Sequence, residues 1–362
     1  MNPSLSKIRE VRVRAVQVPM AHPHRTASGV IAASPLVLTD IVTEDDVVGH
    51  SIVFTYTAAA LKPTAELIRN LEPLVVGEPL APAEIARSLA RQFRLLGTQG
   101  LMGMALAAID MASWDALARK HSISLTRLLG GIEKPIPAYG AVGFDGVSGA
   151  ARAAEEWAKR EFKGVKAKIG YPTVQQDLEV VRAIRQAVGH EMAIMVDYNQ
   201  CLTPTEAVRR LHALDGEGLT WVEEPVMAHD YDGHAFVARA IHTPIQCGEN
   251  WWGANEVQHA LQVGASDYIM LDVMKIGGVT GWLRAAALAE AHAVPLSNHL
   301  WPEISAQLMC TTPVAHYLEY ADWWNPILSE PLRVEHGMAI IETTPGTGVQ
   351  WNEKALTRFA AG

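Results

Sequence analysis

The sequence predicts an α/β protein in which a closed parallel barrel of the TIM type follows a smaller α+β module. From Ile136 onward, short apolar runs alternate with helical segments, and eight candidate strands end about 20 to 29 residues apart. Before that point, three strand-like runs come first and helical segments follow. We therefore divide the chain into a module of residues 1–132, a barrel of residues 133–330, and residues 331–362, which we expect to pack back on the first module.

The first module is predicted to be a three-stranded meander followed by helices. Alternating apolar and polar residues indicate strands at Ile8–Met20, Leu36–Thr43 and Val47–Phe54. The stretch Ala21–Ser34 contains Pro23 and Gly29 and shows little periodicity, so we expect a loop there. Helical periodicity then follows at Ala58–Leu71, Pro82–Leu96 and Leu101–Lys120.

Composition and charge argue against several classes of function. The formal net charge of −9 disfavours nucleic acid or an anionic membrane as a partner. Residues 2–14 are polar and basic, unlike a signal peptide, and we find no apolar run as long as a membrane span. The three cysteines lack the spacing of a metal site, so we expect reduced thiols in the cytoplasm. A small-molecule substrate is the partner that these features favour.

Ionisable side chains end seven of the eight candidate barrel strands. The strands are predicted to end at Tyr139, Lys168, Asp197, Glu223, Glu249, Asp272, His299 and Glu319. Active sites of parallel barrels lie at the carboxyl ends of the strands. Chance places charges at one or two strand ends, not at seven, so we expect these side chains to converge on one functional cavity.

Lys166 and Lys168 lie two residues apart on a predicted strand, so their side chains point to the same face. Two ammonium groups about 7 Å apart repel by roughly 2.4 kcal/mol at an effective dielectric of about 20. Repulsion and burial both lower the pKa of a lysine. A lone pair of this kind is usually a solvated surface feature, but the carboxylates that follow favour Lys168 as a neutral base.

Asp197, Glu223 and Glu249 end the third, fourth and fifth predicted barrel strands. Each acidic residue alone is more often a surface charge. Three carboxylates in one barrel mouth repel one another unless a cation neutralises them. Ligation by oxygen alone favours a hard divalent ion, so we expect Mg²⁺ rather than zinc.

Asp272 and His299 end adjacent predicted strands, the sixth and seventh. An aspartate that accepts from one imidazole nitrogen fixes the tautomer and makes the other nitrogen more basic, which favours His299 as a second base. Glu319 ends the eighth strand. A carboxylic acid that a dry site keeps protonated can donate a hydrogen bond to a developing oxyanion, and the alternative is a supporting charge.

Taken together, these motifs resemble the enolase superfamily, and within it the mandelate racemase group. The similarity runs through nearly the whole chain in family order. The matching segments are Ile109–Asp115, Lys166–Gly170, Val196–Gln200, Trp221–Pro225, Gly248–Asn250, Asp272–Gly278, Ser297–His299 and Leu318–Glu319.

The resemblance implies that the first module caps a (β/α)7β barrel and that Mg²⁺ binds Asp197, Glu223 and Glu249. It also implies a common reaction step, removal of the proton α to a carboxylate to give an enediolate. Relatives of this kind are homo-oligomers, so the resemblance implies an octamer or a smaller homo-oligomer.

The resemblance further implies that Lys168 and His299 are two bases on opposite sides of the metal. Lys166 would lower the pKa of Lys168 and contact the substrate carboxylate, Asp272 would orient His299, and Asn199 would contact the α-substituent. In the muconate-lactonizing group a lysine at the sixth barrel strand is a base, and Lys275 lies close to that position in this chain. Because this chain also has the aspartate–histidine pair, we treat Lys275 as supporting.

The residues that set substrate choice depart from those of racemases acting on mandelate. Those enzymes carry a polar Ser-His pair where this chain has Ala141 and Val142, and their loop matching Ala21–Ser34 is apolar. Here that loop holds polar residues, whereas other residues of the first module are suited to wall an apolar pocket. Besides Asn199, the predicted substrate contacts are Tyr56, His24, Arg25 and Ile31.

Two reactions fit these residues. The leading hypothesis is racemisation or epimerisation of a 2-hydroxy acid, because two opposed bases can remove a proton and return it on the other face. The alternative is β-elimination of water from an acid sugar, in which His299 would act as an acid and His24 and Arg25 would hold hydroxyl groups. A third class, a catalytically silent binding or structural protein, is disfavoured because the predicted metal ligands are all present.

Overall fold

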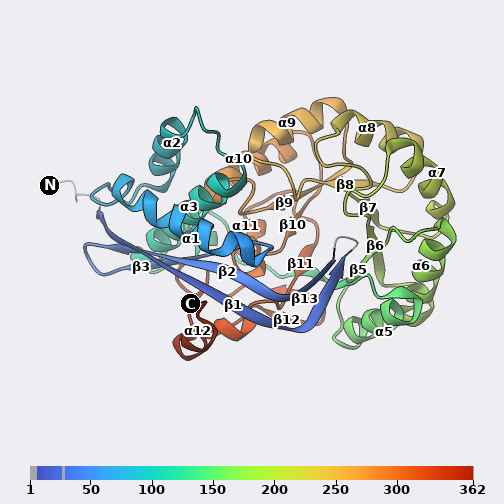
Figure 1. Ribbon diagram of the computed structural model, residues 1–362, viewed down its shortest axis with the longest axis horizontal. Helices are drawn as coiled ribbons and strands as arrows, with labels where there is room; N and C mark the ends of the chain where they lie inside the picture. Colours follow the sequence, from blue (N-terminus) through green and yellow to red (C-terminus); the bar gives the residue numbers. More distant parts are fainter. Residues whose placement is uncertain (1–5, 27–28, 362) are drawn as a thin grey trace.

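The computed structural model describes residues 6–26 and 29–361, and it begins with a three-stranded antiparallel sheet. The strand order is β1-β2-β3, with β1 at Ile8–Thr26, β2 at Gly29–Thr43 and β3 at Val48–Phe54. The helices that follow are α1 (Ala58–Leu71), η1 (Glu72–Leu74), α2 (Pro82–Gln92), α3 (Gly100–Lys120) and α4 (Leu125–Leu128). Figure 1 shows this part, in blue to cyan, beside a larger curved array of strands and helices.

The stretch predicted as a loop is for the most part a β-hairpin, which corrects the sequence prediction. Strands β1 and β2 continue to pair at their tips through His24 with Ile31 and Arg25 with Val30, after a register shift between Pro19 and His24. Prolines cannot donate to a sheet ladder and a bulge breaks the period-two pattern, so the alternation was lost here. Residues 27 and 28 of the predicted loop lie outside the described residues.

Helix α3 is the core helix of this first part. Apolar side chains surround it, and it packs against β2, β3 and α1. Its length and composition suffice to cross a membrane, which corrects the expectation that no apolar run is that long, but 78% of its most apolar window is buried inside the protein. Helix α2 ends at Gln92, four residues before the predicted Leu96.

The second part alternates strands with helices. Seven strands are each followed by a helix, and the eighth strand is followed by the short 3₁₀ turn η2 (Asn325–Ile327). The strands are β4 (Ile136–Val142), β5 (Gly164–Lys168), β6 (Ala193–Asp197), β7 (Trp221–Glu223), β8 (Ile245–Cys247), β9 (Tyr268–Asp272), β10 (Leu296–His299) and β11 (Leu318–Tyr320). The helices are α5 (Gly146–Lys159), α6 (Val174–Val188), α7 (Pro204–Leu214), α8 (Tyr231–Ala240), α9 (Ala254–Val263), α10 (Gly278–Ala291) and α11 (Pro302–Cys310).

The strands of this second part form a curled, mainly parallel sheet. Strands β4 to β10 pair in chain order, each parallel to the next, and β11 pairs with β4 in parallel. An isolated parallel bridge between Leu296 and Ala315 connects β10 to the residues just before β11. Figure 1 shows helices α5 to α9 along the outer side of the sheet. Because the strands are parallel, their carboxyl ends gather at one end of the sheet.

Five predicted strand ends are observed where the sequence placed them, and three need correction. Tyr139 lies inside β4, Glu319 lies in the middle of β11, and Glu249 lies two residues beyond the end of β8. Gly248 accounts for the last difference. Its φ of 130° turns the chain out of the ladder, and a Cβ there would meet the carbonyl oxygen of Met270 at 2.5 Å.

The C-terminal segment contacts both parts of the protein. Strands β12 (Arg333–Glu335) and β13 (Met338–Ile340) form a hairpin, and β13 pairs antiparallel with β4. Helix α12 (Glu353–Phe359) lies beside β1, where Arg14 pairs with Glu353 at 2.8 Å. The pairing with β4 was not expected from the sequence, and the division of the chain into three segments stays a prediction.

Candidate active site

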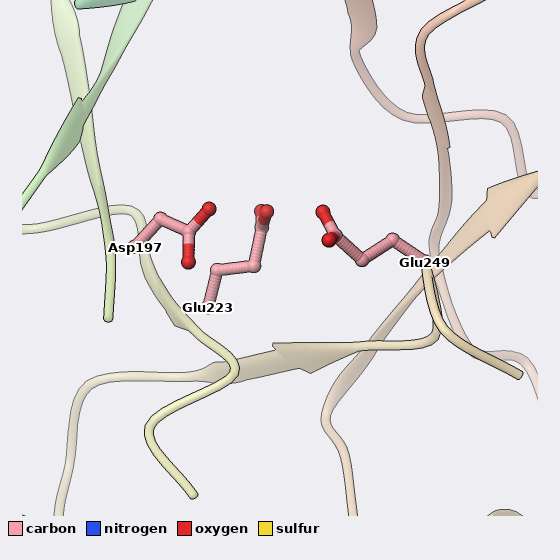
Figure 2. Close-up of side chains that lie close together, drawn as sticks. All are labelled: Asp197, Glu223 and Glu249. Carbon is pink, nitrogen blue, oxygen red and sulfur yellow. The ribbon is translucent and has the colours of Figure 1, made fainter. Parts of the chain in front are cut away.

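Three carboxylates from neighbouring strands form the centre of the site. Asp197 and Glu223 are the last residues of β6 and β7, and Glu249 follows β8. One oxygen of each lies within 4.8 Å of the others, and all three residues are buried. Figure 2 shows them in a row, with Glu223 between Asp197 and Glu249.

This triad fits a divalent cation. Burial raises the pKa of Glu223 well above its usual value, since a carboxylate loses hydration when buried and its acidic neighbours repel it. The Oε2 atom of Glu249 is buried and accepts no hydrogen bond among the described residues, although Nε2 of His299 lies 3.4 Å away. A hard cation would satisfy that oxygen and neutralise the repulsion.

The two lysines of β5 bind the same carboxylates. Lys166 contacts Glu223 and lies 2.9 Å from Glu319, and Lys168 contacts Asp197. Both side chains point to the same side of the strand, as the sequence predicted. Buried ammonium groups are thus paired with buried carboxylates, which is the arrangement that burial demands of charges.

The expected depression of the Lys168 pKa is not observed among these protein groups, and this is a correction. Burial is the largest influence and lowers the pKa of Lys168, and Lys166 lowers it too. The negative charges of Asp197, Glu249 and Glu223 outweigh both and raise the pKa above its usual value. Repulsion between the lysines exists as predicted, but the carboxylates that hold them are closer.

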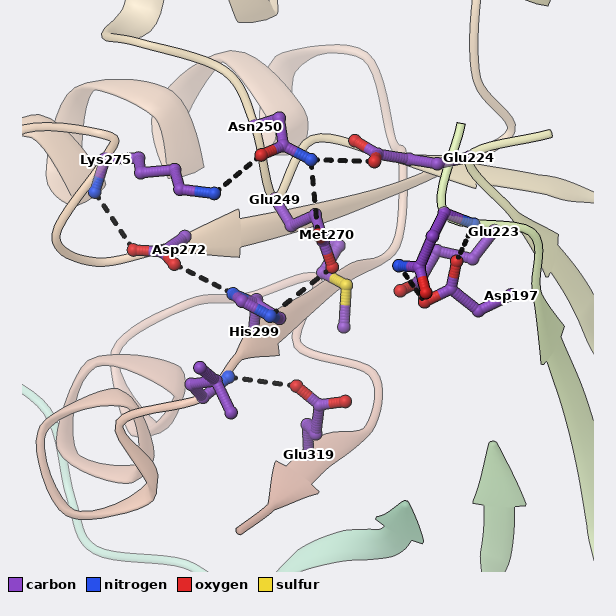
Figure 3. A network of polar contacts seen from close by, with 12 residues as sticks. Asp197, Glu223, Glu224, Glu249, Asn250, Met270, Asp272, Lys275, His299 and Glu319 are labelled. Atoms are coloured by element: carbon purple, nitrogen blue, oxygen red, sulfur yellow. Dashed lines mark hydrogen bonds and ion pairs between the residues drawn. The ribbon is translucent and has the colours of Figure 1, made fainter. Parts of the chain in front are cut away.

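His299 is held between two carboxylates. Its Nδ1 lies 2.8 Å from Oδ2 of Asp272, and its Nε2 lies 3.4 Å from Oε2 of Glu249. The other oxygen of Asp272 accepts hydrogen bonds from the backbone N–H groups of Met274 and Lys275 at 2.9 and 3.0 Å. Asp272 is therefore fixed by its own loop and can fix the imidazole in turn, as Figure 3 shows.

Glu319 differs from its prediction as a protonated acid. Burial raises its pKa, but the charges of Lys166 and His299 and the N–H of Leu300 lower it more, so the net direction is downward. Its Oε2 accepts from the Leu300 N–H at 3.0 Å. With these partners Glu319 is an ionised carboxylate, and its role as an electrophilic acid stays a prediction.

Asn199 and Lys275 lie at opposite flanks of the triad. Asn199 has a left-handed φ of 45°, and its backbone and side-chain nitrogens donate to Asp197 at 2.7 and 3.2 Å. Lys275 donates to Asn250 at 2.6 Å, and Asn250 donates to Glu249 at 3.2 Å and to Glu224 at 2.7 Å. Lys275 therefore supports the Glu249 flank through an amide, as Figure 3 shows.

A cavity of about 760 Å³ opens over these groups, and residues of both parts of the protein line it. Lys168, Asn199 and His299 line it from the strand ends, and Tyr56 reaches into it from the loop after β3. The cavity is also lined by His24, Ile31, Phe54, Met104, Gln200, Glu249, Asn250, Trp252, Lys275, Leu300 and Trp323.

Of the predicted substrate contacts in the first part, three line this cavity and one does not. His24, Ile31 and Tyr56 line it, and burial lowers the pKa of His24 to about 3, so its imidazole is neutral at pH 7. Arg25 is 62% exposed, lies 3.8 Å from Asp145 and lines a separate cavity of about 550 Å³. Neighbouring residues of an extended strand point to opposite faces, which explains why His24 and Arg25 diverge.

Comparison with protein families matches both parts of the chain. Residues 8–130 match the N-terminal domain of mandelate racemase and muconate lactonizing enzyme, and residues 149–355 match the enolase C-terminal domain-like family. The chain belongs to the mandelate racemase/muconate lactonizing enzyme family.

Members of this family with different activities are similar to the chain. A D-galactarolactone cycloisomerase of Agrobacterium fabrum is 31% identical over 98% of both chains. The structure of an enolase from Bradyrhizobium, complexed with magnesium and mandelic acid, is 41% identical, has a TM-score of 0.96 and covers 99% of this chain and 100% of that chain. The structure of an L-talarate dehydratase from Polaromonas, complexed with magnesium and L-glucarate, is 27% identical, with a TM-score of 0.92 and coverage of 99% and 98%.

Several residues that line the cavity were missed by sequence reasoning. Gln200 and Asn250 each follow a predicted site residue, so the rule that found the strand ends could have included them. Met104 lies on α3 and Trp252 in the loop after β8, and both line the cavity without any pattern that marks them. An apolar residue of a buried helix gives the same signal whether it faces a core or a substrate.

Proposed function

We propose that this protein removes the proton α to the carboxylate of a 2-hydroxy acid and returns a proton on the opposite face, as a racemase or epimerase. The observation that carries the proposal is the placement of Lys168 and His299. Each contacts an outer carboxylate of the triad, Asp197 and Glu249 respectively, and both line one cavity. Two bases at opposite ends of the triad suit the two faces of one carbon atom.

The triad is proposed to hold Mg²⁺, which supplies positive charge for the substrate carboxylate and the enediolate. The all-oxygen donors support this choice, as do the magnesium complexes of the similar structures. Once the triad is neutralised, burial and Lys166 are left to lower the pKa of Lys168, which favours a neutral base. Asp272 would hold His299, Lys166 would contact the substrate carboxylate, and Glu319 would hold Lys166 in place.

An aromatic 2-hydroxy acid is the substrate class that we favour. The Bradyrhizobium structure with mandelic acid is 41% identical over nearly the whole chain, and Ile31, Phe54 and Trp323 give the cavity an apolar wall. We further propose that the curled sheet is a closed (β/α)7β barrel and that the protein works as a cytoplasmic homo-oligomer. These proposals follow the family resemblance.

Dehydration of an acid sugar is the second candidate. Gln200, Asn250 and Lys275 add polar groups to the cavity, and His24 replaces apolar surface at the hairpin tip. The similar Polaromonas structure is an L-talarate dehydratase complexed with L-glucarate. In this reaction His299 would donate a proton to the leaving hydroxyl group.

Proton exchange in D₂O distinguishes the two candidates. We expect the purified protein with Mg²⁺ to exchange the α-proton of either enantiomer of mandelate and to erase its optical rotation, as followed by NMR and polarimetry. A 2-keto acid formed from glucarate or talarate, with no exchange or racemisation of mandelate, would overturn the racemase and establish the dehydratase.

Replacing one base tests the two-sided geometry. We expect His299→Asn to lower exchange from one enantiomer by about 10²- to 10⁴-fold, the usual worth of a general base, and to spare exchange from the other enantiomer. Lys168→Ala should give the opposite preference. Equal losses with both enantiomers would show that one base serves both faces.

A further inference from the structure

Two consecutive left-handed residues connect His299 to helix α11. Leu300 has a φ of 49° and Trp301 a φ of 45°, and neither is glycine. This conformation is sparsely populated for such residues and persists only where surrounding bonds hold it. Leu300 is held on both sides, since its N–H donates to Glu319 and its carbonyl accepts from Asn298 at 2.8 Å and from Ser305 at 3.2 Å.

The indole of Trp301 connects this segment to the first part of the protein. Trp301 is 1% exposed, and its Nε1 donates to the carbonyl oxygen of Ile52 in β3 at 2.9 Å. Among the described residues, strand β3 pairs with β2 alone, and the Thr55 N–H donates toward β2. Backbone groups of an antiparallel strand alternate in direction, so the carbonyl of Ile52 points to the open edge of the sheet. The indole thus supplies a donor to a sheet edge that β2 does not reach.

The contacts return to His299 by a second route and form a closed circuit. Two residues beyond the end of β3, the hydroxyl of Tyr56 lies 3.4 Å from Oδ2 of Asp272. The same oxygen of Asp272 contacts Nδ1 of His299. The indole ring of Trp301 also lies edge-on to the imidazole, with 6.3 Å between the ring centroids.

Lys168 lies outside this circuit. Its ammonium group contacts Asp197, on the other flank of the triad. A change that moves Leu300 and Trp301 therefore acts on the His299 side of the cavity and leaves the Lys168 side in place.

We propose that Trp301 is a positioning residue for His299, which it holds in register with Asp272 and Glu249 by anchoring the left-handed segment to the edge of β3. The inference rests on the proposed function, in which His299 is one of two bases. It predicts an effect on one face of the substrate only, which a general loss of stability would not produce.

The test is Trp301→Phe, which keeps an aromatic ring and removes the indole N–H. Misplacement of a reacting group by about 1 Å can cost about 10²-fold in rate. We expect α-proton exchange that depends on His299 to fall by about 10- to 100-fold, and exchange that depends on Lys168 to change by less than about 3-fold. His299→Asn and Lys168→Ala, measured in the same experiment as Trp301→Phe, show which enantiomer depends on which base.

Trp282→Phe is the matched control. Trp282 is also fully buried, and its Nε1 donates to Thr312 at 3.2 Å, away from the cavity. The variant Trp282→Phe also loses an indole N–H hydrogen bond, and it should leave the ratio of the two exchange rates unchanged. If Trp301→Phe does not fold, Ser305→Ala removes a single bond to Leu300 and should shift the ratio the same way by a smaller factor.

A crystal structure of Trp301→Phe decides the inference independently of activity. We expect Leu300 to leave the left-handed region and the His299–Asp272 distance to exceed 2.8 Å by several tenths of an ångström. Unchanged geometry, or equal losses of exchange from both enantiomers, would overturn the positioning role. A wild-type protein that exchanges neither enantiomer would overturn the proposed function instead, and the crystallographic comparison would still decide the role of Trp301.

Discussion

The two buried lysines of the site are stable because each has a carboxylate partner. Lys166 is 1% exposed and pairs with Glu223 and Glu319, and Lys168 pairs with Asp197. Removing one partner of such a pair strands the other as an uncompensated buried charge, which is strongly destabilising. Substitutions in the triad should therefore keep the side-chain volume and leave each lysine a carboxylate partner, as Glu319 would remain for Lys166 after a change of Glu223.

Glu223→Gln is expected to weaken metal binding while preserving the fold. Glutamine keeps the side-chain volume but removes one of three negative charges around the ion, so we expect at least about a tenfold rise in the dissociation constant for Mg²⁺, measured by calorimetry. Glu206→Gln, on the exposed face of α7 where Glu206 pairs with Arg209, is the control and should bind normally. Full activity of the wild type after exhaustive EDTA treatment would contradict the metal requirement.

His234 should make stability fall at acidic pH. Burial lowers its pKa to about 4, and its Nε2 has no hydrogen-bond partner among the described residues. The unfolded chain takes up this proton near pH 6.5 and the folded chain only near pH 4, so folding loses up to about 3 kcal/mol as the pH falls between these values. His234→Asn should lack this part of the acid dependence in urea titrations at pH 7 and pH 4. An identical pH dependence of the two proteins would contradict the assignment.

At the scale of elements, the β1–β2 hairpin brings only one of two neighbouring residues to the site cavity: His24 lines it as well as the second cavity, whereas Arg25 lines the second cavity alone. His24 faces the site and Arg25 faces outward, so each provides a control for the other. For an aromatic 2-hydroxy acid we expect His24→Val to leave kcat/KM unchanged or to raise it, because apolar surface replaces a buried imidazole. For an acid sugar the same change should cost about 2- to 13-fold, because the neutral imidazole of His24 makes a hydrogen bond between uncharged groups. Arg25→Val should change kcat/KM by less than about twofold with either substrate, and a larger loss would place Arg25 in the site.

The strand ends were predictable and the hairpin was not, for physical reasons. Lys168, Asp197, Glu223, Asp272 and His299 sit where short apolar runs stop, so alternation with helices sufficed to bring them to one end of the sheet. The hairpin tip depends on a register shift and on prolines, which erase periodicity without preventing pairing. The direction of the Lys168 pKa depends on distances between side chains of different strands, which spacing along the chain does not contain.

At the scale of the whole molecule, apolar residues on the surface favour self-association. Leu95 is fully exposed and Leu96 is 71% exposed in the connection between α2 and α3, and Ile132 is 79% exposed. Adjacent exposed leucines are unfavourable in water and typical of a contact with another chain. We expect light scattering to give a multiple of 39.3 kDa for the wild type. Leu95→Glu with Leu96→Glu should lower the mass, and a wild-type monomer at micromolar concentration would contradict the homo-oligomer.

The hairpin of β1 and β2 has a further consequence for how this protein can change. Most of the reaction groups are spread over separate strands of the curled sheet, so no short stretch of the gene carries them all. The tip of the hairpin is one contiguous stretch whose two strands pair with each other, and it meets the barrel part through loops, where the Phe144 N–H donates to the Arg25 carbonyl at 2.8 Å and Ser34 donates to the Trp323 carbonyl at 3.0 Å. A replacement of that single stretch can therefore change the substrate contacts in one genetic event, whereas new chemistry would require coordinated changes at positions between Lys166 and Glu319. Under selection for a different substrate, the first substitutions should therefore occur between Met20 and Ser34.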